Sequence, residues 1–395
     1  MRNVNRPTPD PVAPPSTTSA AATLDAAWHR VIRRRSFLQT SVGFGIAAAV
    51  PAQALLAGTA HAASASGSIS SSDAALLRFA AAAELIESDL WSQYAELGGA
   101  NGGNAAYKLA LQNLDADMPQ YISDNTDDEL SHAAFLNAYL QSKGAQPVNL
   151  DAFRTLPSSK ATGAKQIGRL TNLLNLDVDT SWYTRYRSTL NPDLGATFPQ
   201  ALTIHNEPAI PLNDKDTPPG QKQPIPPVTR GQRRMQAIAN TAGFHFAFIE
   251  QGGSSLYPIL ALKAQNAEVL RVLLSIGGVE IDHFSLWHDK VGNAVAQPLA
   301  GVKDPETGLT FPDFNAAPFG GELFQTNLIL PEPAQFLSTS LPVCSVIRPT
   351  LDQNGGAMAA IKGFTADLLF AGQSQKFFDA VNALAEAADA AQRGF

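Results

Sequence analysis

One spacing, a glutamate followed three residues later by a histidine, occurs twice in this chain and constrains its fold most strongly. The stretches "DELSHAAFL" and "GGVEIDHFSLW" contain the pairs Glu129/His132 and Glu280/His283. Residues three apart on a helix share a face, with Cβ atoms about 5–6 Å apart, so that a carboxylate and an imidazole can bind one metal ion. A single pair would usually be a hydrogen-bonded pair on a helix surface, but two pairs suggest a repeated unit.

The segments upstream of the two pairs are also similar. "AAAELIESDLWSQYAEL" and "GFHFAFIEQGGSSLYPIL" share an Ile-Glu dipeptide that ends in Glu87 and Glu250, and Tyr94 and Tyr257 follow seven residues later. The order along the chain is therefore Glu, Glu-x-x-His, Glu, Glu-x-x-His. This is the ligand order of four-helix bundles that hold two metal ions in their core.

In this ligand order the chain resembles the ferritin-like superfamily of di-iron and di-manganese carboxylate proteins. Within it, the chain is most similar to exported ferritin-like domain proteins, which include plant desiccation-related and fungal stress-response members. The resemblance covers about residues 74–143 and 232–292. It implies an all-α, ferritin-like four-helix bundle with two metal ions. It also implies six ligands: Glu87 and Glu250 as the single glutamates, Glu129 and Glu280 as bridging carboxylates, and His132 and His283 as terminal imidazoles.

Glu84 is an alternative to Glu87, because it precedes Glu87 by one helical turn. The matching position in the second segment is Ala247, and this difference favours Glu87.

Four other polar residues lie near the predicted ligands. Tyr94 and Tyr257 are two turns from the single glutamates and are either hydrogen-bonded core residues or electron carriers. His245 and His288 are each five residues from a predicted ligand, about 140° away around the helix, which predicts positions beside the site or on the surface.

Four carboxylates and two imidazoles match two divalent cations, and without metal such a buried cluster would be costly. Oxygen and nitrogen ligands suit iron or manganese. Two bridged ions with open positions predict reactions with dioxygen or peroxide: ferrous oxidation, peroxide disproportionation or substrate oxidation. The alternative is a non-catalytic scaffold for stress protection or binding, with a vestigial or partly occupied site.

Residues 1–62 have the features of a twin-arginine signal peptide. In "RRRSFLQ", Arg34-Arg35 precede Phe37-Leu38, and an Ala-rich apolar stretch leads to a small-residue cleavage site at 60–62. Pro51 and several glycines make this stretch a poor membrane anchor. We therefore expect export to the periplasm or the extracellular space, and no stable membrane span after cleavage.

Charge and cysteine content narrow the functional classes further. Removing the leader's six basic and two acidic residues leaves 22 basic and 33 acidic residues, a net charge of about −11. Nucleic acid is therefore an unsuitable partner. The single cysteine, Cys344, excludes an internal disulfide and a CxxC site.

The pattern after the leader predicts a polar linker at 63–73 and bundle helices within 74–292. Asp73 is a candidate N-cap, and the third helix is expected to be interrupted or kinked at "QGGSS". Pairs of adjacent glycines lie beside Glu250 and Glu280, and none lies beside Glu87 or Glu129. We therefore expect the two metal positions to differ in geometry.

An insertion at about 144–231 exceeds what a bundle crossover needs. It is expected to contain two short helices, at "AKQIGRLTNLLNLD" and "SWYTRYRSTL". The aromatic residues of the second either pack the insertion on the bundle or line a ligand site. Residues 293–395 are expected to wrap the bundle irregularly and then form C-terminal helices, which cap the bundle or mediate homo-oligomer contacts.

Overall fold

The computed structural model describes residues 67–186, 198–215, 225–316, 327–330, 340–342, 344–346 and 355–393. All of them belong to one compact unit, Ser64–Phe395. The predicted signal peptide lies outside the described residues, as do the first residues of the predicted linker.

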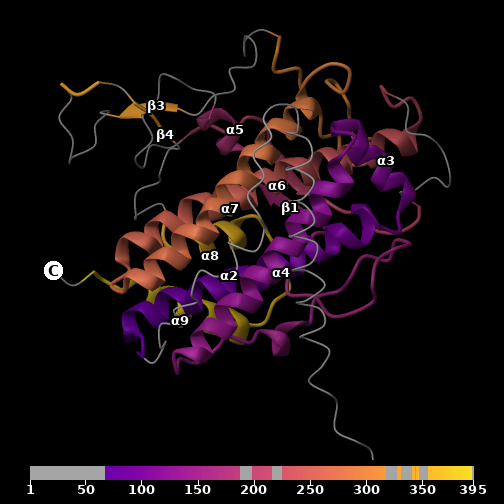
Figure 1. Cartoon of the computed structure of the whole chain (residues 1–395). Helices are drawn as coiled ribbons and strands as arrows, with labels where there is room; N and C mark the ends of the chain where they lie inside the picture. The colour runs from indigo at the N-terminus through magenta and orange to yellow at the C-terminus, as the bar shows by residue number, and fades with distance from the viewer. Residues whose placement is uncertain are drawn as a thin grey trace, which may run out of the picture. The chain divides into compact units, whose positions relative to one another are not determined.

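Four long helices form the core of this unit: α2 (Ser71–Gly98), α4 (Met118–Ser142), α6 (Arg230–Lys263) and α7 (Ala267–Val291). Helix α2 packs along α4 and α6 packs along α7, and α2 also contacts both α6 and α7 (Figure 1). The prediction of an all-α bundle is therefore confirmed. Aliphatic and aromatic side chains form a continuous buried core between the helices.

The helix ends follow from local hydrogen bonding. Ser70, rather than the predicted Asp73, is the N-cap of α2 and accepts a hydrogen bond from the Asp73 amide. Thr229 and Gln232 form a capping box at the start of α6. Helix α6 is continuous through 251–255, so the interruption expected at "QGGSS" is not present.

Asp73 instead connects two bundle helices. Its side chain is 1% exposed, and its carboxylate accepts hydrogen bonds from the backbone amides of Gln265 and Asn266, at 2.8 and 3.1 Å. Asn266 is the N-cap of α7. The carboxylate therefore joins the first turn of α2 to the α6–α7 turn.

The first of the two short helices predicted in the insertion is not present. Residues 164–175 follow an irregular path, and Leu176–Val178 (β1) pairs antiparallel with Ile204–Glu207 (β2). The short helix predicted here is wrong because the buried Asp89 carboxylate accepts hydrogen bonds from the backbone amides of Leu170 and Thr171, which fixes a non-helical path.

Part of the second predicted helix is present as α5 (Ser181–Arg185), while residues 187–197 lie outside the described part. Trp182 is 1% exposed and packs against Phe244 of α6 and Phe284 of α7. The aromatic residues of this segment thus pack the insertion against the bundle.

The other elements of secondary structure are shorter. They are α3 (Ala105–Leu114), the 3-10 turns Asp151–Phe153 and Gly292–Val295, a hairpin of β3 (Asn327–Leu330) and β4 (Cys344–Val346), α8 (Ala357–Ala366) and α9 (Gln375–Asp389). Helix α3 packs on α6, α9 packs on α2, and α8 contacts α9 and α6. Among the described residues, no helix is long and apolar enough to cross a membrane.

Replacing Asp73 with alanine should lower the free energy of unfolding by about 1–3 kcal/mol, because two backbone amides lose their acceptor. Urea denaturation measures this change. Asp289→Ala is the matched control, because the Asp289 side chain is 62% exposed, and it should change stability by less than about 0.5 kcal/mol. Equal effects of the two substitutions would contradict the role given to Asp73.

Candidate metal centre

Each long helix contributes at least one acidic side chain to the interior of the bundle. Seven acidic and imidazole residues there are buried: Glu84 and Glu87 from α2, Glu129 and His132 from α4, Glu250 from α6, and Glu280 and His283 from α7. They belong to buried stretches of otherwise apolar character. The helix packing therefore forces these charged groups together.

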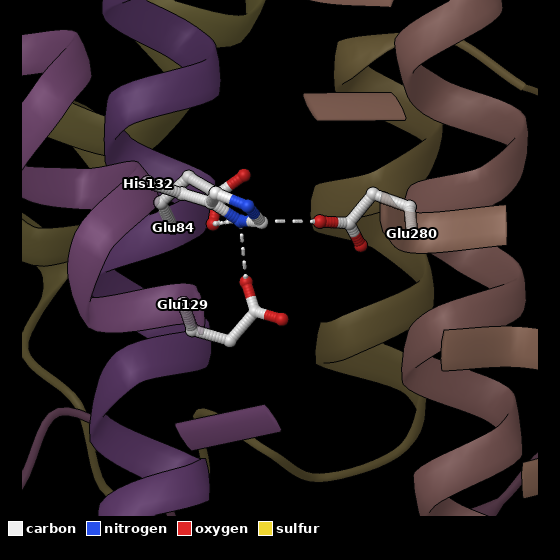
Figure 2. A group of neighbouring side chains, drawn as sticks. All are labelled: Glu84, Glu129, His132 and Glu280. Carbon is white, nitrogen blue, oxygen red and sulfur yellow. Dashed lines mark hydrogen bonds and ion pairs between the residues drawn. The ribbon is translucent and has the colours of Figure 1, made fainter. Parts of the chain in front are cut away.

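One group consists of Glu84, Glu129, His132 and Glu280 (Figure 2). The Nδ1 atom of His132 lies 3.3 Å from Glu84 Oε2, 3.2 Å from Glu129 Oε2 and 3.5 Å from Glu280 Oε1. Figure 2 shows the Glu280 side chain approaching His132 from the opposite helix. Three helices thus direct ligand atoms at one point.

A second group consists of Glu129, Glu250, Glu280 and His283. The Nδ1 atom of His283 lies 3.2 Å from both Glu129 Oε1 and Glu250 Oε2. Glu129 and Glu280 belong to both groups, so that the two groups form one cluster with two carboxylates between them.

These separations fit metal ligation better than direct hydrogen bonding. Ligands about 2.1 Å from an octahedral ion lie about 3.0 Å from their neighbours, close to the 3.2–3.5 Å seen around His132 Nδ1. An imidazole nitrogen carries at most one hydrogen, so His132 Nδ1 cannot donate to three carboxylates. A cation among these atoms would satisfy all of them together.

Buried oxygen atoms without a hydrogen bond support the same interpretation. Among the described residues, Oε2 of Glu280 has no hydrogen-bond or ion-pair partner, and Oε2 of Glu84 and Oε1 of Glu280 have only their contacts with His132 Nδ1. A buried carboxylate oxygen without a partner is strongly destabilising. The residues therefore fit metal cations bound by oxygen and nitrogen ligands.

The pKa values show what the cluster requires in the absence of a cation. Burial raises the pKa of Glu84 to about 8, against the opposing effect of His132. Burial and the neighbouring carboxylates raise the pKa of Glu280 well above its ordinary value. For Glu129, burial raises the pKa, but His132 and His283 outweigh burial and lower it. Without a cation, protons on some of the glutamates therefore reduce the negative charge of the cluster. Bound metal ions would otherwise neutralise this charge.

Different hydrogen-bond partners support the two halves of the cluster. Asn125 donates to Glu129 at 2.8 Å and to Glu250 at 3.0 Å, and its Oδ1 accepts a 2.7 Å hydrogen bond from Trp287. An indole nitrogen only donates, which fixes the orientation of the amide. The Tyr257 hydroxyl donates to Glu84. The hydrogen-bond partners of the two groups therefore differ.

The second half of the cluster has one more acidic neighbour. Asp128 lies 3.1 Å from His283 Nε2, on the side of the ring away from the cluster. A carboxylate at this position orients a metal-ligating imidazole and increases its basicity. The sequence signal for this residue is its acidic side chain directly before Glu129, which the ligand spacing alone does not single out.

Five of the six predicted ligands lie in the two groups, and Glu87 does not. Glu84, the alternative, occupies that place in the first group. Glu87 is 4% exposed, and its Oε2 has no hydrogen-bond partner among the described residues. Burial, followed by the Glu129 and Glu84 carboxylates, raises its pKa well above the ordinary value.

The other polar residues considered from the sequence are buried. The Tyr94 hydroxyl lies 2.7 Å from His245 Nδ1, and burial lowers the pKa of His245 to about 3, so its imidazole is neutral. His288 is 1% exposed and packs against Trp182. Neither histidine belongs to a metal-ligand group, and neither is on the surface.

Two of the four glycines beside Glu250 and Glu280 lie in tight contacts, and the other two do not. A Cβ atom at Gly253 would lie 2.1 Å from Glu280 Oε2, and one at Gly277 would lie 2.7 Å from Tyr257 Cβ. The lack of a side chain at Gly253 leaves room for the Glu280 carboxylate. The lack of a side chain at Gly277 lets α7 approach α6 closely at Tyr257. A Cβ atom at Gly252 or Gly278 would meet nothing within 4 Å.

A family model for the ferritin-like domain matches residues 72–293, more than half of the chain, and the chain belongs to this family. Neither the comparison with curated proteins nor the comparison with solved structures gave a match. The matched residues include all four bundle helices from Ser72 onward and every member of both ligand groups. The buried carboxylate–histidine cluster is thus a possible metal site within a ferritin-like domain.

Alanine substitutions distinguish Glu84 from Glu87 as a ligand. Glu84→Ala should reduce the bound metal from about two ions towards one, because one group loses a carboxylate. Glu87→Ala should retain two ions, because Glu87 lies outside both groups. Elemental analysis after dialysis, with circular dichroism as the folding check, measures both. The opposite pattern would identify Glu87 as the ligand, as predicted from the sequence, and place Glu84 outside the site.

Gly253→Ala should weaken metal binding at least about tenfold, because the added methyl group displaces the Glu280 carboxylate. Gly252→Ala is the matched control: it adds the same group one residue away in open space. Metal titration of the two variants provides the comparison. Unchanged affinity in Gly253→Ala would show that the position of Glu280 is not critical.

Proposed function

We propose that this protein is an exported, dinuclear iron or manganese protein that carries out redox chemistry with dioxygen or peroxide. The observation that carries the proposal is the sharing of Glu129 and Glu280 between two groups of ligand atoms. Two shared carboxylates are the arrangement expected for two ions held close together.

The chain's own residues would bind and orient the two ions. Glu84 and His132 would hold one ion, Glu250 and His283 would hold the other, and Glu129 and Glu280 would lie between them. Asn125 and Tyr257 would orient the carboxylates through their hydrogen bonds. Two adjacent redox-active ions would supply two electrons to, or accept two from, a single oxidant or reductant.

The surrounding side chains would restrict what reaches the ions. Trp91 stacks on Trp287 with ring centroids 5.4 Å apart, and both rings are no more than 1% exposed. These rings and the aliphatic core keep bulk water from one side of the cluster. A dry environment strengthens the electrostatic interactions of the ligands with bound cations.

The exported location is proposed from residues 1–62. The Arg34-Arg35 pair, the apolar stretch and the small-residue cleavage site support export through the twin-arginine pathway, which carries folded proteins. Loading of metal before export would suit a buried site. The similarity to desiccation-related and stress-response proteins supports a protective role in the cell envelope.

Activity assays of metal-loaded protein test this proposal. Metal-free protein is loaded with Fe(II) without oxygen, and oxygen uptake is then followed. A Mn(II)-loaded sample is given peroxide, and oxygen release is followed. At least one rate should exceed that of the Glu129→Ala/Glu280→Ala double variant by about tenfold or more, or about 1.4 kcal/mol in activation free energy.

Two results would contradict the redox proposal. Absence of bound metal in the wild-type protein would remove its basis. Binding of two ions, with neither rate above that of the double variant, would favour the non-catalytic scaffold for stress protection or binding.

A further inference from the structure

A cavity of about 360 Å³ lies beside the cluster, against the face of α6 that carries the two adjacent glycines. Its walls come from α6, α8, α5, the segment around Gln200, and Glu87 of α2. Ligand cavities in proteins typically measure about 300–1,000 Å³. This volume is much larger than dioxygen, peroxide or a metal ion requires.

The two glycines connect the cavity to the cluster. Both line the cavity, and a side chain at Gly252 would extend into open space. Gly253 touches the Glu280 carboxylate, because a Cβ atom there would overlap Oε2. At this point only the glycine backbone separates the cavity from a carboxylate shared by both ligand groups.

Glu87 supplies the deeply buried polar group of the cavity wall. Its side chain is 4% exposed, lines the cavity, and has an Oε2 atom with no hydrogen-bond partner among the described residues. Glu87 is also outside both groups of metal ligands. A buried carboxylate in this position is suited to accept a hydrogen bond from a bound molecule.

The rest of the lining indicates the chemistry of that molecule. Phe248, Leu256 and Phe364 provide apolar surface. The carboxylate of Asp179 disfavours an anion, and the guanidinium of Arg185, which lies over the Phe198 ring at 5.2 Å, disfavours a cation. The lining therefore fits a neutral molecule with an apolar ring and a hydrogen-bond donor.

We propose that this cavity binds a small neutral aromatic molecule whose hydroxyl group donates a hydrogen bond to Glu87. Binding depends on the cavity alone. The additional role of this molecule as an organic substrate of the metal centre rests on the proposed function.

Saturation-transfer NMR with benzyl alcohol, phenol and 2-phenylethanol tests the proposal, with toluene as the matched probe that lacks a donor. Wild-type protein should give signals from the three alcohols. Gly252→Phe should reduce these signals at least about fivefold, because the ring fills the cavity. Gly278→Phe adds the same ring on α7, where a Cβ atom also meets nothing within 4 Å, and should behave as wild type.

A second variant tests the hydrogen bond itself. Glu87→Ala should lower the preference for benzyl alcohol over toluene by about fivefold, as expected for one lost hydrogen bond of about 1 kcal/mol. If Gly252→Phe does not fold by circular dichroism, Gly252→Leu replaces it as the smaller filling variant. Absence of alcohol binding, or equal binding by wild type and the filled variant, would overturn the proposal.

Metal content, measured in the same samples, separates this inference from the proposed function. Two bound ions without alcohol binding would overturn the cavity proposal alone. Alcohol binding that is sensitive to residue 252, in a protein that binds no metal, would support the cavity and overturn the redox function.

Discussion

Burial of four carboxylates and two imidazoles at one level of a helical bundle is the constraint on which the rest of this structure depends. Apolar packing of the four helices brings these groups together, but it offers them almost no counter-charge. A buried carboxylate is stable only when it is protonated, paired or bound to a cation. The raised pKa values of Glu84 and Glu280 correspond to protonation, and the sharing of Glu129 and Glu280 between two ligand groups corresponds to cation binding. Metal binding therefore relieves a cost that the fold itself creates.

The two halves of the bundle repeat each other incompletely, and the differences have structural reasons. The two ligand groups correspond to each other when Glu84 is matched with Glu250. In the same alignment of the two halves, Glu87 corresponds to Gly253. The first half thus has a carboxylate where the second half has a glycine that admits Glu280. Both of these residues line the same cavity. This departure from symmetry therefore lies where the cluster borders that cavity.

Sequence alone was sufficient for the bundle, because the repeated Glu-x-x-His spacing and the similar segments upstream of both pairs indicated four helices. It was not sufficient to choose between Glu84 and Glu87, which lie one turn apart on the same helix face. The Ile-Glu dipeptide favoured Glu87, whereas three-dimensional packing decides which carboxylate reaches His132. The helix expected at 164–177 failed for a similar reason: a distant carboxylate, Asp89, fixes the backbone there. Hydrogen bonds between segments far apart in sequence leave no local pattern.

Anomalous X-ray diffraction from crystals of the metal-loaded protein, recorded at the iron or manganese absorption edge, would locate any bound ions. We expect two peaks within the bundle, one contacted by Glu84 and His132 and the other by Glu250 and His283, with Glu129 and Glu280 between them. A single peak, a peak ligated by Glu87 in place of Glu84, or no peak in fully loaded crystals would contradict this expectation.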